Sequence, residues 1–262
     1  MSGKVIVEKE NGVAVIRLNR PEVMNAFDLE TQEELAGAIK DVANDDNAKV
    51  LIFTGTGKAF CAGVDIADIE GLSAQQTRSS LKNAQQLIVA LANMEKPVIA
   101  AVNGLAVGAG CSIAMACDII IASSNALFSQ SFVKIGLVSD MGGMYFLPRM
   151  VGLARAKELL FTGAALDAKS ARDIGMVNRV VPEGESERAA KDLAREIAAG
   201  PVKPIGLMKK ILNQSTYLDL PSLLELEAEA QEVCAQTEDH KIRVQAFLNR
   251  KKGHVDAEND HR

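Results

Sequence analysis

One carboxyl group, that of Asp140, lies in an otherwise largely apolar, glycine-containing segment, residues 135–143. Two glycine-rich turns precede it, at residues 59–65 and 103–110. Small residues let a ligand approach the backbone closely, and two such turns can direct backbone N–H groups at one oxygen atom. A carboxylate opposite that oxygen can move a proton. The pattern predicts enolate chemistry, in which a proton leaves a carbon beside a carbonyl group that the protein holds.

Asp140 also has a purely structural interpretation. A helix is predicted to begin at Met141, and Ser139 or Asp140 could cap it. The catalytic interpretation is preferred because a site for a carbonyl oxygen is predicted nearby. The residues expected to line the carboxyl group are apolar: Phe132, Val138, Met141 and Met144. Such a lining should raise the pKa of Asp140, which suits a base that must also return its proton.

Imidazole chemistry is excluded from most of the chain, because its three histidines, His240, His254 and His261, all lie near the C-terminus. Ser112 has nearly the spacing of a serine hydrolase nucleophile, but such a serine needs a histidine base. A small polar residue on a tightly packed helix is the favoured interpretation of Ser112. The four cysteines show no paired spacing of the kind that binds metal, so the sequence indicates no metal site.

Charge and hydropathy restrict the partners of the protein. The formal net charge of −5 argues against nucleic acid, since phosphate binding needs a basic face. Residues 98–117 carry no charge and are long enough to span a bilayer, but Pro97 opens the stretch and Asn103-Gly104 interrupts it. A buried strand, a tight turn and a buried helix are predicted there instead. With no signal peptide evident, we expect a cytoplasmic protein that has no membrane partner.

The elements that must position these residues alternate between strands and helices. Apolar runs bounded by turn residues predict a hairpin and three buried strands, at residues 5–7, 13–18, 50–54, 98–102 and 118–122. Helical spacing predicts helices from about Asp28, over residues 74–94 and up to Cys117. Strands that are apolar on both faces are typical of parallel sheets covered by helices, so the predicted fold class is α/β.

The C-terminal part of the chain has a different pattern. Beyond about Leu153 the spacing is helical almost throughout, and a segment with two prolines, residues 200–204, predicts a hinge. We therefore predict a core over residues 1–200 and a helical region over residues 201–262. Apolar residues recur at helical spacing in this region, at Leu223, Leu224, Leu226, Ala230 and Val233. This stripe would either form a subunit interface or pack on the protein's own core.

Several motifs occur together in the order found in a known family. They are Asn19-Arg20-Pro21 with Asn25-Ala26, Ala59-Phe60-Cys61-Ala62-Gly63-Val64-Asp65-Ile66, Lys96-Pro97-Val98-Ile99-Ala100-Ala101-Val102-Asn103-Gly104, and Gly142-Gly143. Jointly they resemble the crotonase family, the enoyl-CoA hydratase/isomerase superfamily, over nearly the whole chain. The resemblance implies a crotonase-like spiral of ββα units with a helical C-terminal trimerisation region, and a homotrimer or dimer of trimers. It also implies an acyl-CoA thioester substrate, with no metal and no cofactor besides the coenzyme A of that substrate.

The resemblance assigns candidate site residues as well. The thioester oxygen would lie between the N–H groups of Val64 and Ala109, which would form an oxyanion hole. Further substrate-binding positions would be Ala26, Ala62, Gly63, Asp65, Ile66, Ser112 and Phe132. Ser112 and Phe132 stand where the hydratases of the family carry two glutamates, and neither can act as an acid or a base.

Asp140, by contrast, stands where the isomerases of the family carry their catalytic aspartate, and residues 128–149 look most like the phenylacetate-pathway type. The expected function is that of an enoyl-CoA isomerase, in which Asp140 moves a proton through an oxyanion-stabilised dienolate. The alternatives are an enoyl-CoA hydratase with Asp140 activating water, a non-catalytic acyl-CoA binding protein, and a serine hydrolase that uses Ser112.

Overall fold

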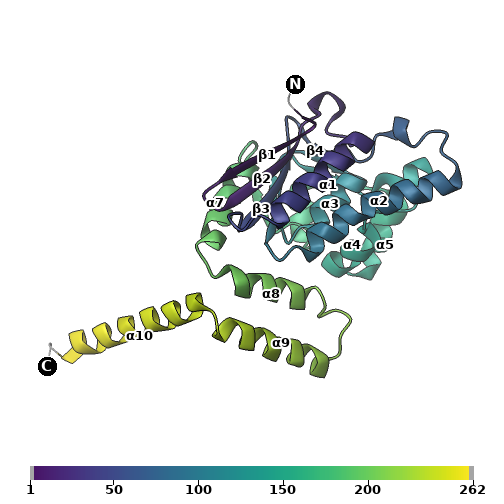
Figure 1. Cartoon of the computed structure of the whole chain (residues 1–262). Helices are drawn as coiled ribbons and strands as arrows, with labels where there is room; N and C mark the ends of the chain where they lie inside the picture. The colour runs from purple at the N-terminus through teal and green to yellow at the C-terminus, as the bar shows by residue number, and fades with distance from the viewer. Residues whose placement is uncertain (1–2, 260–262) are drawn as a thin grey trace. The chain divides into compact units, whose positions relative to one another are not determined.

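The computed structural model describes residues 3–259, and it describes side chains as far as residue 249. The chain divides into two units, Met1–Ala199 and Gly200–Arg262. The first unit contains two sheets and the helices that cover them (Figure 1). The second unit is helical.

The larger sheet of the first unit has six strands in the order β1-β2-β3-β5-β7-β10 (Figure 1). Their bounds are Val5–Glu10, Val13–Leu18, Val50–Gly55, Val98–Val102, Ile119–Ser123 and Arg179–Val181. β1 and β2 form the predicted antiparallel hairpin, and each later strand pairs in parallel with its neighbour. Because β3 and β5 are buried along their whole length, both faces of this sheet need cover.

Helices supply that cover on both faces. On one face, α7 (Ser186–Ala198) packs Ala190 and Ala194 against Ile52 and Ile99. On the opposite face lie α1 (Leu29–Ala43), α2 (Ala74–Asn93) and α3 (Ala109–Ala116) (Figure 1). Alternating side chains of the strands therefore enter two separate cores, as the period of two in a β-strand requires.

The second sheet is built from three-residue strands in the order β4-β6-β8-β9. Their bounds are Ala59–Cys61, Leu105–Val107, Leu127–Ser129 and Ala165–Asp167. The first three are parallel, and β9 is antiparallel to β8. Three successive repeats thus each place one strand in the large sheet, the next in the small sheet, and then a helix: β3-β4-α2, β5-β6-α3 and β7-β8-α4, where α4 is Gly143–Val151. This is the expected spiral of ββα units, and the α/β fold class is confirmed.

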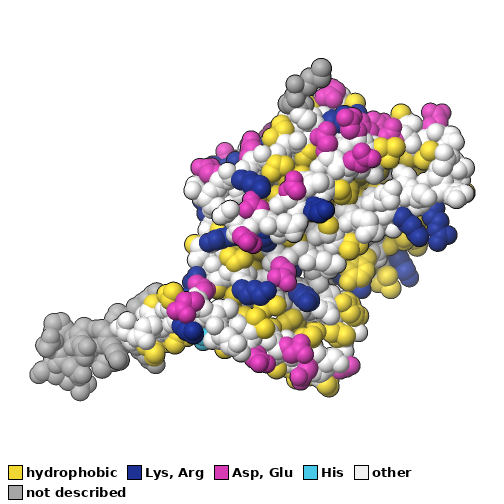
Figure 2. Space-filling model, viewed as in Figure 1, with side chains coloured by type: hydrophobic (Ala, Val, Ile, Leu, Met, Phe, Trp, Pro, Cys, Tyr) yellow, Lys and Arg dark blue, Asp and Glu magenta, His cyan; other side chains and the backbone are white. Residues whose placement is uncertain are grey.

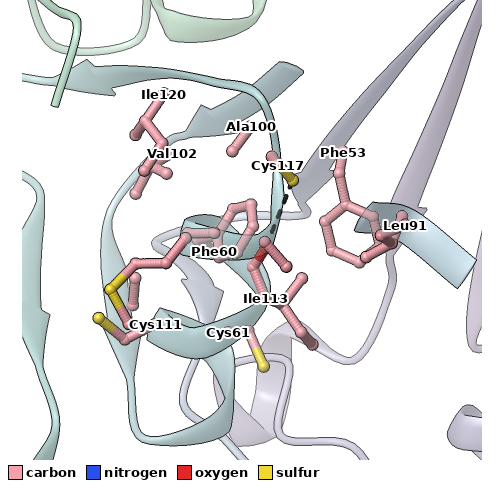
Figure 3. Packing of buried hydrophobic residues seen from close by; sticks show 14 of the residues in the cluster. Phe53, Phe60, Cys61, Leu91, Ala100, Val102, Cys111, Ile113, Cys117 and Ile120 are labelled. Carbon is pink, nitrogen blue, oxygen red and sulfur yellow. Dashed lines mark hydrogen bonds between the residues drawn. The ribbon is translucent and has the colours of Figure 1, made fainter. Parts of the chain in front are cut away.

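The core between the two sheets fixes the small sheet against α3 (Figure 3). Phe60 on β4 packs against Phe53 on β3, with ring centroids 5.5 Å apart. Gly110 allows α3 to lie directly on β4, because a Cβ atom at that position would be only 2.2 Å from the Cys61 carbonyl oxygen. A substitution at Gly110 would therefore separate the helix from the strand that precedes the first glycine-rich turn.

The short strands account for most of the differences from the sequence-based prediction. β4, β6 and β8 were not predicted, because three residues are too few to show a strand period. β9 and β10 lie in the region that was predicted to be helical almost throughout, between α5 (Leu153–Thr162), α6 (Ala168–Asp173) and α7. Residues 98–117 form β5, β6 and α3, as the strand-turn-helix interpretation requires. Among residues 3–259, no helix is long and apolar enough to cross a membrane.

The second unit consists of α8 (Val202–Leu212), α9 (Leu220–Ala235) and α10 (Glu238–Asn259). Asp219 caps α9, since its carboxylate accepts a hydrogen bond from the Ser222 N–H at 2.9 Å. Every residue of α9 is half-buried or exposed, and Leu224 and Val233 of the predicted stripe are about half exposed. Figure 2 shows further hydrophobic side chains at the surface of this unit. The unit thus presents apolar surface within a single chain.

Candidate active site

Three neighbouring strands of the small sheet end at the same edge. β4, β6 and β8 are parallel, so their carboxyl ends lie side by side. β4 leads into Ala62, Gly63 and Val64, β6 leads into Gly108 and Ala109, and β8 leads into Gln130. Residues that are far apart in sequence are thereby brought to one edge, the position where α/β folds place ligands.

The N–H group of Val64 is directed away from the nearest chain segment. Phe27 donates its N–H to the Gly63 carbonyl at 2.9 Å and accepts from the Asp65 N–H at 3.2 Å. In a parallel bridge, the residue between two such partners points its own N–H to the other side. Within the described residues, the Val64 N–H donates to no acceptor. It is therefore available to a ligand.

The N–H group of Ala109 is free for a related reason. Ala109 is the first residue of α3, and the first N–H groups of a helix have no partner within it. The described residues provide no other acceptor for this N–H. The helix N-cap is Gly108, with a φ of 54° that favours glycine. The two glycine-rich turns touch, since a Cβ atom on Gly63 would lie 3.5 Å from the Ala109 nitrogen.

Phe132 supplies an apolar wall beside the second turn. It belongs to the 3-10 helix η3 (Ser131–Ile135), which follows β8, and its side chain is buried. A Cβ atom on Gly108 would lie 3.6 Å from the Phe132 ring. The ring therefore lies against the peptide that precedes the Ala109 N–H. A carbonyl oxygen near that N–H would be in a poorly hydrated place, where hydrogen bonds to charge are strongest.

Asp140 precedes α4 (Gly143–Val151) without capping it. The N-cap of α4 is Gly142, and none of the described side chains caps this helix, so the helix-cap interpretation of Asp140 and Ser139 is wrong. Instead, the Asp140 backbone carbonyl accepts hydrogen bonds from the Ser112 hydroxyl at 3.0 Å and the Gly143 N–H at 2.9 Å. The backbone of Asp140 is thus held by α3 on one side and by α4 on the other.

The carboxyl group of Asp140 has the environment of a base rather than of an ion pair. Its Oδ1 atom is buried and has no hydrogen-bond partner among the described residues. Burial raises the pKa of Asp140 to about 6, because a desolvated carboxylate is costly. The predicted apolar lining is only partly correct. Phe132 and Met141 are buried, whereas Val138 is 74% exposed and Met144 is 56% exposed.

Ser112 is fully buried on α3. Its hydroxyl lies 3.0 Å from the Asp140 carbonyl oxygen and 3.3 Å from the Gly108 carbonyl oxygen, and it accepts from the Gln130 amide at 3.1 Å. A nucleophile must reach its substrate, so a serine without exposed surface contradicts the serine hydrolase alternative. This environment also fits support of Asp140 better than direct contact with a ligand.

The other predicted substrate-binding residues line the first turn and the segment beside it. Ala26, Ala62 and Asp65 are half-buried, and Ile66 is 61% exposed. Asp65 caps the 3-10 helix η2 (Ile66–Asp68) and lies 3.5 Å from the Arg20 guanidinium. Its carboxylate is therefore engaged within the protein.

Sequence reasoning missed two residues at this edge, Arg20 and Gln130. Arg20 forms ion pairs with Asp28 at 3.2 Å and with Asp65, and it donates to the Ala26 carbonyl. Gln130 is buried, and its amide contacts Ser112. The available signal for Gln130 was weak: two polar residues, Ser129 and Gln130, follow the short apolar run of residues 126–128. No pattern in the sequence pairs Arg20 with Asp28 or with the more distant Asp65.

The comparison with protein families agrees with this geometry. Residues 8–257 match the family described as enoyl-CoA hydratase/isomerase. The chain belongs to this family. The resemblance inferred from the motifs is confirmed, and so is the general class of the protein, an enzyme of the enoyl-CoA hydratase/isomerase family that acts on acyl-CoA.

Individual relatives within the family carry names for different reactions. The chain is 40% identical to the short-chain-enoyl-CoA hydratase of Clostridium acetobutylicum over 95% of both chains. It is 38% identical to the 1,2-epoxyphenylacetyl-CoA isomerase of Escherichia coli, over 93% of this chain and 95% of that protein. The crystal structure of an enoyl-CoA hydratase from Bacillus anthracis matches with a TM-score of 0.91 at 32% identity, covering 95% of this chain and 97% of that one. Family membership alone therefore does not distinguish hydration from isomerisation, and the residues of the site must be considered.

Proposed function

We propose that this protein is an enoyl-CoA isomerase that shifts a carbon–carbon double bond by proton transfer. The N–H groups of Val64 and Ala109 hold the thioester oxygen. Asp140 takes a proton from the carbon between the carbonyl group and the double bond, which leaves a dienolate. The same carboxyl group then returns the proton to the far end of the conjugated system, so that the double bond moves and no atom is gained or lost.

The main observation that supports the proposal is the environment of the Asp140 carboxyl group. It has a buried oxygen without a hydrogen-bond partner among the described residues, and its pKa is raised to about 6. A base in this range is ionised at neutral pH yet returns a proton readily. General acid–base catalysis contributes about 10²- to 10⁴-fold. Two N–H donors aimed at the developing oxyanion contribute roughly 3 kcal/mol each.

The residues at positions 112 and 132 favour isomerisation over hydration. Hydration of an enoyl group needs one group to activate water and another to deliver a proton. Ser112 is fully buried and hydrogen-bonded, and Phe132 cannot ionise. Asp140 is then the residue that moves the proton in both directions. We further propose that Ala26, Ala62, Gly63, Asp65 and Ile66 contact the coenzyme A arm of the substrate.

Product analysis over a small panel of 2-enoyl-, 3-enoyl- and dienoyl-CoA esters tests the proposal. The wild-type protein should interconvert positional isomers without a gain of mass. Asp140→Asn should lose this turnover and keep its affinity for a saturated acyl-CoA, since the N–H donors are unchanged. Unchanged isomerisation by Asp140→Asn would refute the assignment.

Hydration is the second candidate, because the relative from Clostridium acetobutylicum that shares 40% identity is named a hydratase. In this case Asp140 would activate a water molecule. Loss of enoyl absorbance with crotonyl-CoA, together with a mass gain equal to one water, would favour the hydratase. Saturable binding of every ester without turnover would instead favour a non-catalytic acyl-CoA binding protein.

We also propose that residues 201–262 assemble the protein as a homotrimer or a dimer of trimers. The apolar side chains that α9 exposes within a single chain support this, because large exposed apolar patches mark interfaces. Sedimentation equilibrium measures the mass directly. Replacing Leu224, which is 51% exposed, with Asp should shift the mass toward the monomer. A monomeric wild-type protein at micromolar concentration would contradict the proposal.

A further inference from the structure

The amide of Gln130 occupies the centre of a buried hydrogen-bond network at the edge of the small sheet. Its Nε2 atom lies 3.3 Å from the Gly108 carbonyl oxygen and 3.1 Å from the Ser112 hydroxyl. Its Oε1 atom accepts from the Ser139 hydroxyl at 2.8 Å. The Gly108 carbonyl can only accept a hydrogen bond, so the NH₂ end of the amide must face it. Gln130 is 4% exposed, and its amide is therefore fixed in one orientation.

One end of this network controls the direction of the Ala109 N–H. The Gly108 carbonyl and the Ala109 N–H belong to the same peptide group, which is planar and trans, so they point in opposite directions. The Gly108 oxygen accepts from the Ser112 N–H at 3.0 Å in addition to Gln130. Because the peptide is planar, fixing the Gly108 oxygen also fixes the direction of the Ala109 N–H on the opposite side. Donors on the carbonyl also polarise the peptide, which strengthens the hydrogen bond that its N–H can give.

The other end of the network controls Asp140. Ser139, which is adjacent to Asp140, is tied to the Gln130 Oε1 atom. The Ser112 hydroxyl accepts from Gln130 and lies 3.0 Å from the Asp140 carbonyl oxygen. The Gln130 amide is closely packed against the start of α4, because a Cβ atom on Gly143 would lie 2.6 Å from the Gln130 Oε1 atom. One amide therefore joins the peptide that carries an oxyanion donor to the segment that carries the carboxyl group.

We propose that Gln130 is a positioning residue that sets the distance between the Ala109 N–H and the Asp140 carboxyl group. The inference rests on the proposed proton transfer by Asp140 and adds a residue that touches neither substrate nor reacting atom. Proton transfer is sensitive to this distance, since a displacement of about 1 Å can cost about 10²-fold in rate. A glutamine suits the role because it donates at one end and accepts at the other.

Gln130→Glu and Ser139→Ala test the proposal. Gln130→Glu keeps the shape of the side chain but places a second acceptor opposite the Gly108 carbonyl. Ser139→Ala removes the hydroxyl that holds the Gln130 Oε1 atom. Each variant should lower kcat about 10- to 100-fold with little change in KM, because orientation rather than binding is lost. Ser139→Ala should also move the midpoint of the pH–rate profile below 6, as the Asp140 carboxyl group gains access to water. In Gln130→Glu the added negative charge opposes such a shift, so that variant is judged by kcat alone.

Ser129→Ala is the matched control. Ser129 is buried beside Gln130, and its hydroxyl donates to the Gly163 carbonyl at 3.1 Å, outside the network. Ser129→Ala should lose about as much stability as Ser139→Ala, but it should keep the wild-type kcat and pH midpoint. A general folding defect would affect both serine variants alike. Equal kcat values in Ser139→Ala, Gln130→Glu and Ser129→Ala, with equal pH midpoints in the two serine variants, would overturn the positioning role.

Failure of the proposed isomerase is separable from failure of this inference. The Asp140 pKa can be read by NMR of carboxyl-labelled aspartate, with Asp140→Asn to assign the signal. This measurement needs no turnover. A midpoint near 6 in wild type and Ser129→Ala, and a lower one in Ser139→Ala, supports positioning whatever reaction occurs. The same midpoint in all three proteins would reject it, even if Asp140→Asn proves inactive as an isomerase.

Discussion

Two carboxyl groups of the ββα core have opposite surroundings. Glu187 on α7 accepts two hydrogen bonds of 2.9 Å from the Arg17 guanidinium and pairs with Lys191 at 2.7 Å. The hydrogen bonds from Arg17 are the main reason that the pKa of Glu187 falls to about 2. Asp140 has a buried oxygen with no partner among the described residues, and burial raises its pKa to about 6. Arg17 and Lys191 balance the charge of Glu187, whereas none of the described residues pairs with the Asp140 Oδ1 atom.

The difference separates a carboxylate that is paired within the fold from the one that we propose as the base. Arg17 on β2 and Glu187 on α7 join elements that are distant in sequence, and their pairing satisfies both charges. At Asp140 the hydrogen bonds from Ser112 and Gly143 go to the backbone carbonyl, and none of the described residues donates a hydrogen bond to the buried Oδ1 atom. Such an arrangement costs stability at neutral pH, and it is typical of sites that move protons.

The largest expected effect is the loss of activity in Asp140→Asn. The amide keeps the shape of the side chain but cannot accept a proton, so kcat should fall by about 10²- to 10⁴-fold. Glu187→Gln is the matched control, because its carboxyl group is committed to Arg17, and kcat should stay at the wild-type value. Steady-state kinetics on the preferred enoyl-CoA ester measures both. Equal losses in the two variants would remove the distinction between the two carboxyl groups.

A smaller loss is expected from Gly63→Ala. Gly63 has a φ of 102°, and an added Cβ atom would lie 3.0 Å from the Val107 carbonyl oxygen and 3.5 Å from the Ala109 nitrogen. The turn must shift, and one of the two N–H groups that we propose as oxyanion donors leaves its position, so kcat should fall by roughly 10²-fold. Gly184→Ala imposes a similar backbone strain, with a φ of 81°, but its Cβ atom would meet no atom within 4 Å. It should keep full activity in the same assay.

The smallest expected effects are on stability. Replacing the two carboxyl groups should change the free energy of unfolding in opposite directions. The Glu187 pKa is lowered, so its ionised carboxylate stabilises the fold. This contribution to the free energy of unfolding is complete above the ordinary pKa of 4.5 and is lost as the pH falls toward 2. Glu187→Gln should therefore destabilise the protein at pH 7, by about 1 kcal/mol after allowance for exposure.

The Asp140 pKa is raised, so the ionised form destabilises the fold above pH 6 and the penalty is absent below the ordinary pKa of 3.8. Asp140→Asn should stabilise the protein at pH 7, by on the order of 1 to 2 kcal/mol because the carboxyl group is partly exposed. Urea unfolding at pH 7 and pH 4 measures both variants. A destabilised Asp140→Asn at pH 7 would show that the carboxyl group has a partner.

The sequence predicted the long elements and the motif residues, and it failed on the short elements that bring them together. β3, β5 and α2 were predicted within one or two residues, because apolar runs and helical spacing extend over whole elements. β4, β6 and β8 have three residues each, too few for a period, and yet they carry Val64, Ala109 and Gln130 to one edge. Asp140 was predicted as a candidate from its segment, but the burial of its Oδ1 atom, which has no partner among the described residues, depends on long-range packing that no local pattern encodes.

The pH dependence of isomerisation tests the central claim most directly. The ratio kcat/KM should be measured from pH 4.5 to 8.5 with one enoyl-CoA ester, in the wild-type protein and in Glu187→Gln. A base whose pKa is about 6 predicts a tenfold rise per pH unit below a midpoint near 6 and a plateau above it, in both proteins. A midpoint near 4, or a rate that does not change with pH, would contradict the assignment of an unpaired, buried Asp140 as the group that moves the proton.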